Sequence, residues 1–406
     1  MVLPPINRTT GPAELAAAQR RRKRLITLLA YVVLLCADIA FSHWDELFGQ
    51  ENCTLIRARH WYQRVVTLGY RKPRPHFVRV VTVQPPQDPC GYRLLLSQLV
   101  DRIVISHPMM IVLDYSFSPH NCAQQTYDLQ HSIDSAASQV PVVFGRPSSV
   151  LQEVEDRHRS DLEALEKAGF TSRDQAVWPS DISANGHTEL TGLYRLDCDT
   201  RRIPTHWSVF EKIHGEWVHS GTPMSTIALT AALLYDPSVA NQLAPEGRDN
   251  PFTSFIPEDA FRPLKAEEVL SGKSSPAEWQ LARRIVMVGD EVTDIHESVV
   301  GRVPGVVLQA NYLESLLDDR YFRSLGTVSG TAVTFLCLLT VAIVFDQTEK
   351  ANRALFRSTF VLLILVSTSY FALVHLGRLF TFWLPCVPAV VLACIEKLIA
   401  ERRSGP

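Results

Sequence analysis

The stretch RRIVMVGDEVTDIHESVVGRVPGVVLQANYLESLL, residues 283–317, carries the strongest fold signal in this chain. It opens with residues 284–288, a short run rich in Ile and Val that stops at Gly289, which predicts a buried β-strand. It closes with residues 307–317, whose apolar side chains favour a helix. A strand, a polar loop and a helix in this order are typical of an α/β domain.

The sequence upstream continues this alternation. Residues 77–83 and 109–115 are short and rich in Val and Ile, as buried strands are, and residues 92–105 between them have leucines at helical spacing. Such a strand–helix–strand unit favours a parallel pair of strands. Further helices are expected over residues 132–138, 153–168 and 224–235, and further strands over residues 141–145, 188–196 and 206–219, the last with a turn at His214-Gly215.

Apolar residues concentrate at the two ends of the chain. Residues 25–43 form one apolar stretch, and residues 326–345, 358–376 and 379–398 form three more, with lengths that suit helices crossing a bilayer. The fold class that we predict is therefore an α/β extracytoplasmic domain plus four transmembrane helices, one before the domain and three after it.

A cleaved signal peptide is the alternative for residues 25–43. Cleavage after Ala40 would place Asp38 where a small residue is needed, and Leu35 is too large to precede Cys36 in a lipoprotein signal. These residues favour an uncleaved membrane anchor.

Basic residues predict the orientation of the four helices. They gather in residues 20–24, in the loop 346–357 and around the tail 399–406, and all three clusters fall on one side, the cytoplasmic side. Residues 1–24 are then a cytoplasmic basic tail, and residues 44–325 form the extracytoplasmic domain. That domain has about 280 residues, enough for a full hydrophobic core.

A series of short motifs runs through residues 77–325. The series comprises residues 94–100, 111–114 and Phe117; Asp128, Leu129 and Ile133, followed by residues 142–145; Asp197, Asp199, Arg201, Arg202 and Pro204; residues 255–257; and residues 284–289 with Asp294, His296, residues 304–306, Ala310 and residues 316–317. In this order, with one apolar stretch before and three after, the series resembles the CHASE2 family, an extracytoplasmic sensory domain of bacterial receptors. The resemblance implies a multi-pass protein of the bacterial inner membrane with its main domain in the periplasm.

The sequence departs from the family pattern at several positions. Glu297-Ser298 stands where the family has Thr-Pro, Gln309 where it has His, and Thr200 where it has Gly. In family receptors a cytoplasmic cyclase, kinase or similar domain follows the last span, whereas the short tail 399–406 follows it here. We therefore expect that this chain is not an enzyme and passes its signal to a separate partner protein.

Polar side chains follow two of the predicted strands. Asp114 ends one strand, and Asp290, Asp294 and His296 come after another. Ligands of open α/β sheets bind beyond the carboxyl ends of the strands, so these four residues are our candidates for contact with a small molecule. A carboxylate and histidine metal site is a second interpretation. A polar loop whose acidic residues cap local backbone amides is a third, and we predict no metal and no cofactor.

Half of the cysteines lie in the predicted extracytoplasmic region, where disulfides are permitted. They are Cys53, Cys90, Cys122 and Cys198, which allow three pairings. Cys90 and Cys122 each follow the end of a predicted strand by seven residues. Parallel neighbouring strands would bring both to the same edge of the sheet, so we predict a Cys90–Cys122 bond.

Two functions stay open on the sequence alone. One is a sensory or ligand-binding membrane protein that signals through a partner, and the other is a structural or assembly subunit of a cell-envelope complex. A pocket with converging polar groups would favour the first, and a broad exposed apolar patch the second. An extracytoplasmic hydrolase is disfavoured because no nucleophile–base motif is present, and the net charge of −2 does not indicate a nucleic-acid partner. The partners that we expect are the lipid bilayer, a separate protein and a small molecule outside.

Overall fold

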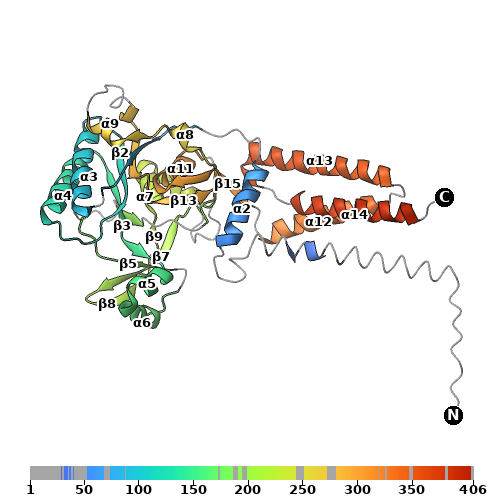
Figure 1. The fold of residues 1–406 in the computed structure, drawn as a ribbon, viewed down its shortest axis with the longest axis horizontal. Coiled ribbons are helices and arrows are strands. Elements are labelled where there is room, and N and C mark those ends of the chain that lie inside the picture. The colour runs from blue at the N-terminus through green and yellow to red at the C-terminus, as the bar shows by residue number, and fades with distance from the viewer. Residues whose placement is uncertain are drawn as a thin grey trace, which may run out of the picture. The chain divides into compact units, whose positions relative to one another are not determined.

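The computed structural model describes the chain over residues 29, 32–34, 36–37, 40, 53–67, 74–86, 88–171, 174–185, 191–193, 199–243, 251–271, 280–319, 321–324, 327–346, 351–379 and 383–403. The chain divides into two compact units (Figure 1). Asn52–Arg323 holds an α/β domain, and Met1–Glu51 together with Ser324–Pro406 holds the long apolar helices.

A six-stranded sheet, parallel throughout, forms the centre of the α/β domain. Its strands lie in the order β11-β1-β12-β2-β3-β6. They are β1 (Val78–Val83), β2 (Met110–Ser116), β3 (Val142–Arg146), β6 (Thr191–Leu193), β11 (Leu264–Lys265) and β12 (Ile285–Asp290). The mixed α/β class and the parallel strands are therefore confirmed. However, β1 and β2 are not direct neighbours, because β12 lies between them and pairs with both.

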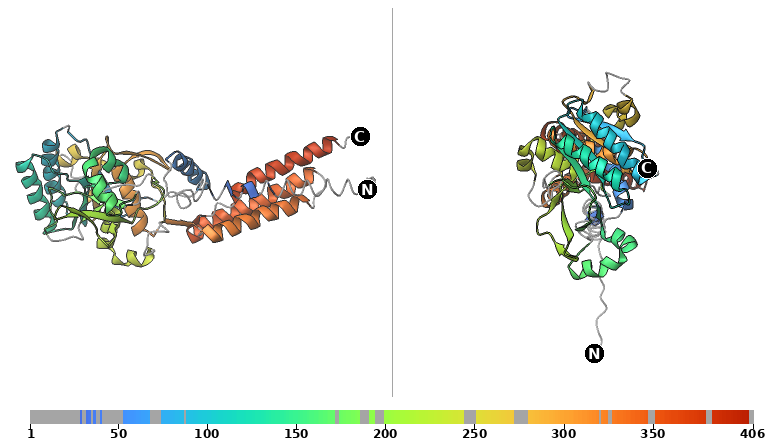
Figure 2. Two further views of the ribbon diagram at one scale, coloured as in Figure 1. Left: turned by 90° about the horizontal axis from the view of Figure 1, so that it is seen from below. Right: turned by 90° about the vertical axis from the view of Figure 1, so that its left-hand side faces the viewer.

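Helices cover both faces of this sheet, so the domain has three layers (Figures 1 and 2). On one face lie α3, α4 and α9, and on the other lie α7 and α11. Their bounds are α3 (Pro89–Val104), α4 (Ala123–Ala137), α7 (Ile227–Tyr235), α9 (Ala266–Leu270) and α11 (Gly305–Leu317).

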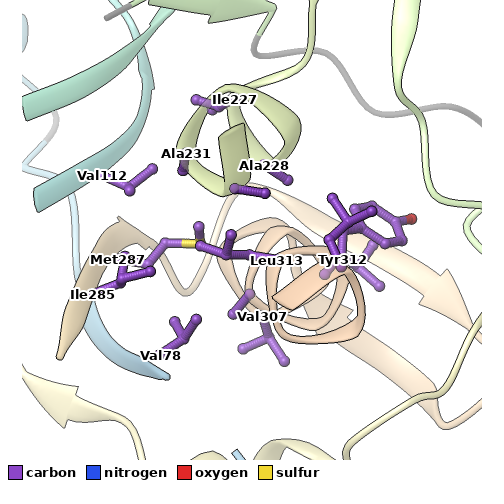
Figure 3. Close-up of a cluster of buried hydrophobic side chains, with 14 of the residues drawn as sticks. Val78, Val112, Ile227, Ala228, Ala231, Ile285, Met287, Val307, Tyr312 and Leu313 are labelled. Carbon is purple, nitrogen blue, oxygen red and sulfur yellow. The ribbon is translucent and has the colours of Figure 1, made fainter. Parts of the chain in front are cut away.

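Alternation along β12 divides the apolar residues between the two faces. Ile285 and Met287 belong to the core under α7 and α11, whereas Val286 and Val288 belong to the core under α3 and α4. Figure 3 shows Ile285 and Met287 on the side of the sheet where Leu313 of α11 lies. The strand is buried on both faces, which explains its unbroken apolar sequence.

A smaller sheet forms a second lobe of the domain. Its strands lie in the order β4-β5-β7-β8, and β9 also pairs with β7. The lobe contains β4 (Ser148–Ser149), α5 (Leu151–Arg157), α6 (Arg159–Lys167), β5 (Asp174–Val177), β7 (His206–Ile213), β8 (Glu216–His219) and β9 (Met224–Ser225).

Of three elements predicted in this region, two differ in detail and one is confirmed. The helix expected over residues 153–168 is broken at His158, which leaves the helical conformation and stacks its ring on Trp178 with centroids 4.0 Å apart. The strand expected over residues 206–219 is the β7–β8 hairpin, with positive φ at His214 and Gly215 as the predicted turn requires. The helix expected over residues 224–235 starts at Ile227, because Met224 and Ser225 pair with β7 as β9.

Shorter elements complete the domain. They are α2 (Cys53–Val66), β10 (Phe252–Thr253), α8 (Glu258–Phe261), the hairpin of β13 (Ile295–Ser298) and β14 (Gly301–Pro304), and β15 (Tyr321–Ser324). β10 pairs with β15 in antiparallel fashion, close to the point where the chain leaves the domain.

Three long helices follow the domain along the chain: α12 (Thr327–Asp346), α13 (Ala351–Leu376) and α14 (Trp383–Arg403). Among the described residues, Leu355–Leu376 is the one segment long and apolar enough to cross a membrane, and Ser329–Phe345 is a shorter apolar helix. The three predicted spans after the domain are thus helical, while four membrane crossings stay a prediction. The span predicted over residues 25–43 lies largely outside the described residues.

A disulfide joins Cys90 and Cys122, the pairing predicted from the sequence, with Cα atoms 5.3 Å apart. Cys90 lies in the first turn of α3, and Cys122 is the N-cap residue of α4. The bond therefore ties the first turns of two helices that pack side by side on the sheet. The strands before these helices, β1 and β2, are not the neighbours that the prediction assumed, but they are parallel, so both helices begin beyond the same edge of the sheet.

We predict that Cys90→Ala lowers the free energy of unfolding of the domain by about 3 kcal/mol, because the disulfide closes a loop of 32 residues. Chemical unfolding of the full chain in detergent, followed by near-UV circular dichroism, measures this change. Cys394→Ala, at a cysteine outside the disulfide, serves as the control. Equal stability of the two variants would contradict the prediction.

Candidate functional site

The carboxyl ends of β2 and β12 bring acidic side chains together. Asp114 lies near the end of β2, and Asp290 is the last residue of the neighbouring β12. Asp294 follows in the loop towards β13, and the charges of Asp290 and Asp294 both act on Asp114. We call these three residues the acidic cluster. The structure therefore assembles the predicted site residues, with His296 joined to the cluster through Asp294.

Asp290 is held by its own loop. Its Oδ1 atom accepts hydrogen bonds from the backbone N–H groups of Val292 at 2.6 Å and Thr293 at 2.9 Å. The Thr293 hydroxyl donates to the other oxygen, Oδ2. This is the capping of local amides that acidic residues in such loops commonly perform.

Asp294 connects the acidic cluster to helix α11. Its carboxylate contacts Nε2 of His296 at 2.7 Å, and its backbone carbonyl accepts a hydrogen bond from the N–H of Gly305 at 2.7 Å. Gly305 is the first residue of α11, and a Cβ atom at this position would overlap the Asp294 carboxylate. The Asp294 carboxylate is thus in close contact with the start of α11, and a side chain at position 305 would displace it.

Asp114 is the buried member of the cluster. Asp114 is only 3% exposed, and its Oδ1 atom has no hydrogen-bond partner among the described residues. Burial raises the pKa of Asp114 well above its ordinary value, and the negative charges of Asp294 and Asp290 raise it further. Asp114 therefore holds a proton to higher pH than an ordinary aspartic acid does.

Two tyrosines lie beside the acidic cluster. The rings of Tyr92 and Tyr115 meet edge to face with centroids 5.0 Å apart. Burial raises the pKa of each hydroxyl above its ordinary value, and Asp114 and Asp290 also raise both. The tyrosines stay neutral and can donate hydrogen bonds beside the acids.

This arrangement can bind protons and hydrogen-bond donors. Deprotonation of Asp114 would place three carboxylates together in a poorly solvated position, which is costly unless a cationic or donor group compensates. Within the described part of the chain, no three His, Cys, Asp or Glu side chains are grouped as metal ligands would be. We therefore assign no metal chemistry to the cluster.

A second polar group joins α2 to the body of the domain. Nε and a terminal nitrogen of Arg201 donate to the two carboxylate oxygens of Asp199, the first at 2.6 Å. Nε2 of His60 in α2 lies 3.8 Å from Asp199 and 3.2 Å from the Thr200 hydroxyl, which donates to the Glu297 carbonyl at 2.8 Å. We call His60, Asp199, Thr200 and Arg201 the α2 anchor.

Charge pairing stabilises the α2 anchor. Burial alone would raise the pKa of Asp199, but Arg201 outweighs it and holds that pKa well below its ordinary value. Burial lowers the pKa of His60, although Asp199 partly opposes this. Asp199 and Arg201 thus form a local ion pair two residues apart, whereas Asp197 of the same motif lies outside the described residues. The partner in α2 gave no sequence signal.

Glu314 is a buried acid that the sequence analysis missed. Its carboxylate accepts hydrogen bonds from the backbone N–H groups of His76, Phe77 and Val78 at 3.0, 2.7 and 2.6 Å. Burial raises its pKa, while these three amides oppose the rise. A single acid within the otherwise uncharged sequence of α11 was the available signal.

A hollow of about 460 Å³ opens near the amino end of β3, opposite the carboxyl edge where the acidic cluster lies. It is lined mainly by apolar atoms of α4 and the start of β3, with Asp134 and Asn185 as polar groups. Its volume lies in the range of small-molecule sites. No motif marked it, because its walls come from separate segments of the chain.

The fold and these sites define an α/β domain with a carboxylate cluster at the carboxyl edge of a parallel sheet. The CHASE2 domain family matches residues 78–344, more than half of the chain. The chain therefore belongs to the CHASE2 family, whose domains are sensory and extracytoplasmic. No curated protein and no solved structure is similar enough to count as a match.

We predict that Asp114→Asn raises the unfolding temperature of the domain at pH 8. Because the folded-state pKa is raised, the wild-type carboxyl stabilises the fold below its unfolded-state pKa of about 3.9, and this contribution is lost as the pH rises towards the folded-state value. Asparagine has the same shape and carries no charge, so its advantage should shrink towards pH 4. Thermal unfolding of the full chain between these pH values measures the effect.

The exposed Asp259→Asn variant is the control for this series. An unfolding temperature below that of the wild type at pH 8 would show that the ionised Asp114 carboxylate is stabilised by a bound cation.

Proposed function

We propose that this protein is a membrane-anchored extracytoplasmic sensor that passes its signal through its apolar helices to a separate partner protein. Membership of the CHASE2 family supports the sensory role. The observation that carries the proposal further is the acidic cluster, in which the buried Asp114 sits beside a carboxylate that touches the start of α11. The proposal assigns no catalytic step to this chain.

The stimulus in this proposal acts on the acidic cluster. Loss of the Asp114 proton, or binding of a small cationic molecule, would change the charge that Asp290 and Asp294 meet. Asp290 is fixed by the amides of Val292 and Thr293, so Asp294 is the member better able to respond. Its movement would alter the contact with Gly305.

Helix α11 is suited to carry that movement. All its residues from Gly305 to Leu316 are buried, so the helix shifts as a unit or not at all. Its second half is attached to the start of β1 through the Glu314 carboxylate. Beyond Leu317 the chain passes through β15 and enters α12 at Thr327, so the route from cluster to apolar helix is short.

A partner protein is the receiver in this proposal. Three long helices follow the domain, although a single membrane span would anchor it. The apolar surface of α13 is large, with Phe356, Phe360 and Leu363 all exposed. A ligand can shift these helices only if it prefers one of two arrangements, and a partner that contacts them would read the shift.

We predict that Gly305→Ala changes the dynamics of β15 and of the start of α12. The added methyl group displaces the Asp294 carboxylate and mimics its movement. Hydrogen–deuterium exchange of the full chain in nanodiscs should show altered protection over residues 321–335. Gly91→Ala is the matched control, since a Cβ atom there makes ordinary contacts, the nearest at 3.4 Å. A change confined to residues around 294 and 305 would exclude this route.

We further predict that the apolar helices carry the partner. Affinity purification from gently solubilised native membranes would compare the full chain with a variant whose residues 326–398 are replaced by one unrelated span. The partner should be recovered with the full chain and lost with the variant. If the variant recovers the same proteins, the domain binds them directly, as a structural subunit of an envelope complex would.

A further inference from the structure

The two faces of helix α2 have an unusual distribution of residues. Its buried face carries the polar residues Arg59, His60 and Gln63. Its exposed face carries Trp61, which is 66% exposed although it is the largest apolar side chain of the helix. The α2 anchor accounts for the burial of His60, whereas Trp61 stays exposed on the opposite face of the same helix.

Two arginines flank this tryptophan on the exposed face. Arg57 lies four residues before Trp61 and Arg64 three residues after it, so the three side chains share one side of the helix. Arg57 pairs with Glu297 at 2.9 Å, and both side chains are well exposed to solvent. An exposed pair of this kind is weak, which leaves the arginine available to another anion.

The anchor places α2 near the point where the chain leaves the domain. His60 contacts Asp199 and Thr200, and the carbonyl of Arg201 accepts a hydrogen bond from the N–H of Thr253 in β10 at 2.8 Å. β10 in turn pairs with β15, whose last residue lies three positions before Thr327 at the start of α12. Figure 1 shows α2 at the same end of the domain as β15.

The chain before α2 gives a second constraint. Residues 44–52 separate α2 from the predicted span over residues 25–43, and such a segment reaches at most about 30 Å when fully extended. If residues 25–43 span the membrane as predicted, the start of α2 can therefore lie no more than about 30 Å from the end of that span.

We propose that the exposed face of α2, formed by Arg57, Trp61 and Arg64, lies against phospholipid headgroups. These headgroups belong to the extracytoplasmic leaflet of the membrane that anchors the chain. The inference rests on the membrane anchoring in the proposed function. Tryptophan is favoured at this depth because its ring is amphipathic, and arginine because it pairs with phosphate. The α2 anchor connects the helix that carries Trp61 to Arg201, whose carbonyl accepts a hydrogen bond from β10.

A phospholipid surface fits this face better than a protein partner does. A single aromatic residue between two cations, Arg57 and Arg64, complements anionic headgroups, which can replace Glu297 as the partner of Arg57. The short segment 44–52 before α2 and the short connection from β15 to α12 also limit how far this face can move from the bilayer.

The test uses the full chain labelled with 5-fluorotryptophan in nanodiscs of phosphatidylcholine and phosphatidylglycerol. Trp61→Phe and Trp217→Phe assign two of the seven tryptophan resonances in the ¹⁹F spectrum. A lipid that carries gadolinium on its headgroup is then added. We expect loss of the Trp61 signal, while the signal of Trp217, buried in the small lobe, is retained. The double variant Arg57→Gln, Arg64→Gln should keep more of the Trp61 signal.

The outcomes separate the inference from the proposed function. Release of the chain from native membranes by alkaline carbonate would overturn both. Retention of the chain in membranes, together with a Trp61 signal that survives as the Trp217 signal does, overturns the inference alone. Loss of the Trp61 signal only in discs with two copies of the chain would identify a second copy as the occupant and would also overturn it.

Discussion

The carboxylate of Glu314 is the interaction on which the rest of the domain depends. It accepts the N–H groups of three successive residues where β1 begins, and so joins the helix before the apolar segment to the parallel sheet. A buried acid is costly unless hydrogen bonds satisfy it, and here three backbone amides do so. The α11 helix is thereby attached at one end to β1 and at the other, through Gly305, to Asp294.

The pKa values of two buried acids in the domain are shifted in opposite directions. Asp199 has Arg201 as a partner, so its pKa is depressed and its charge stabilises the structure. Burial raises the pKa of Asp114, and its two carboxylate neighbours, Asp294 and Asp290, raise it further. A paired acid serves a structural anchor, whereas an acid held among like charges is sensitive to protons or to a bound molecule.

Much of the architecture follows from local sequence patterns. The strand before Gly289, the leucine-rich helix after Cys90 and the turn at His214-Gly215 were predictable because each depends on short-range periodicity or on residues that favour positive φ. Of the site, the pairing of β12 with β2 that groups Asp114 with Asp290 came from the structure, and only the position of each acid at the carboxyl end of a strand was predictable. The contact between Asp294 and Gly305 was not, since it depends on how the β13–β14 hairpin folds back.

The sequence by itself determined the class of the domain, the apolar segments at its two ends and the family to which the chain belongs. Only the tertiary structure decided that β12 lies between β1 and β2, that Glu314 faces the start of β1, and that α2 packs on residues 199–201. The physical reason is the sequence separation between the residues that interact. Periodicity and turn chemistry act over a few residues, whereas these contacts join segments that are distant in the sequence and meet only when the whole core is packed.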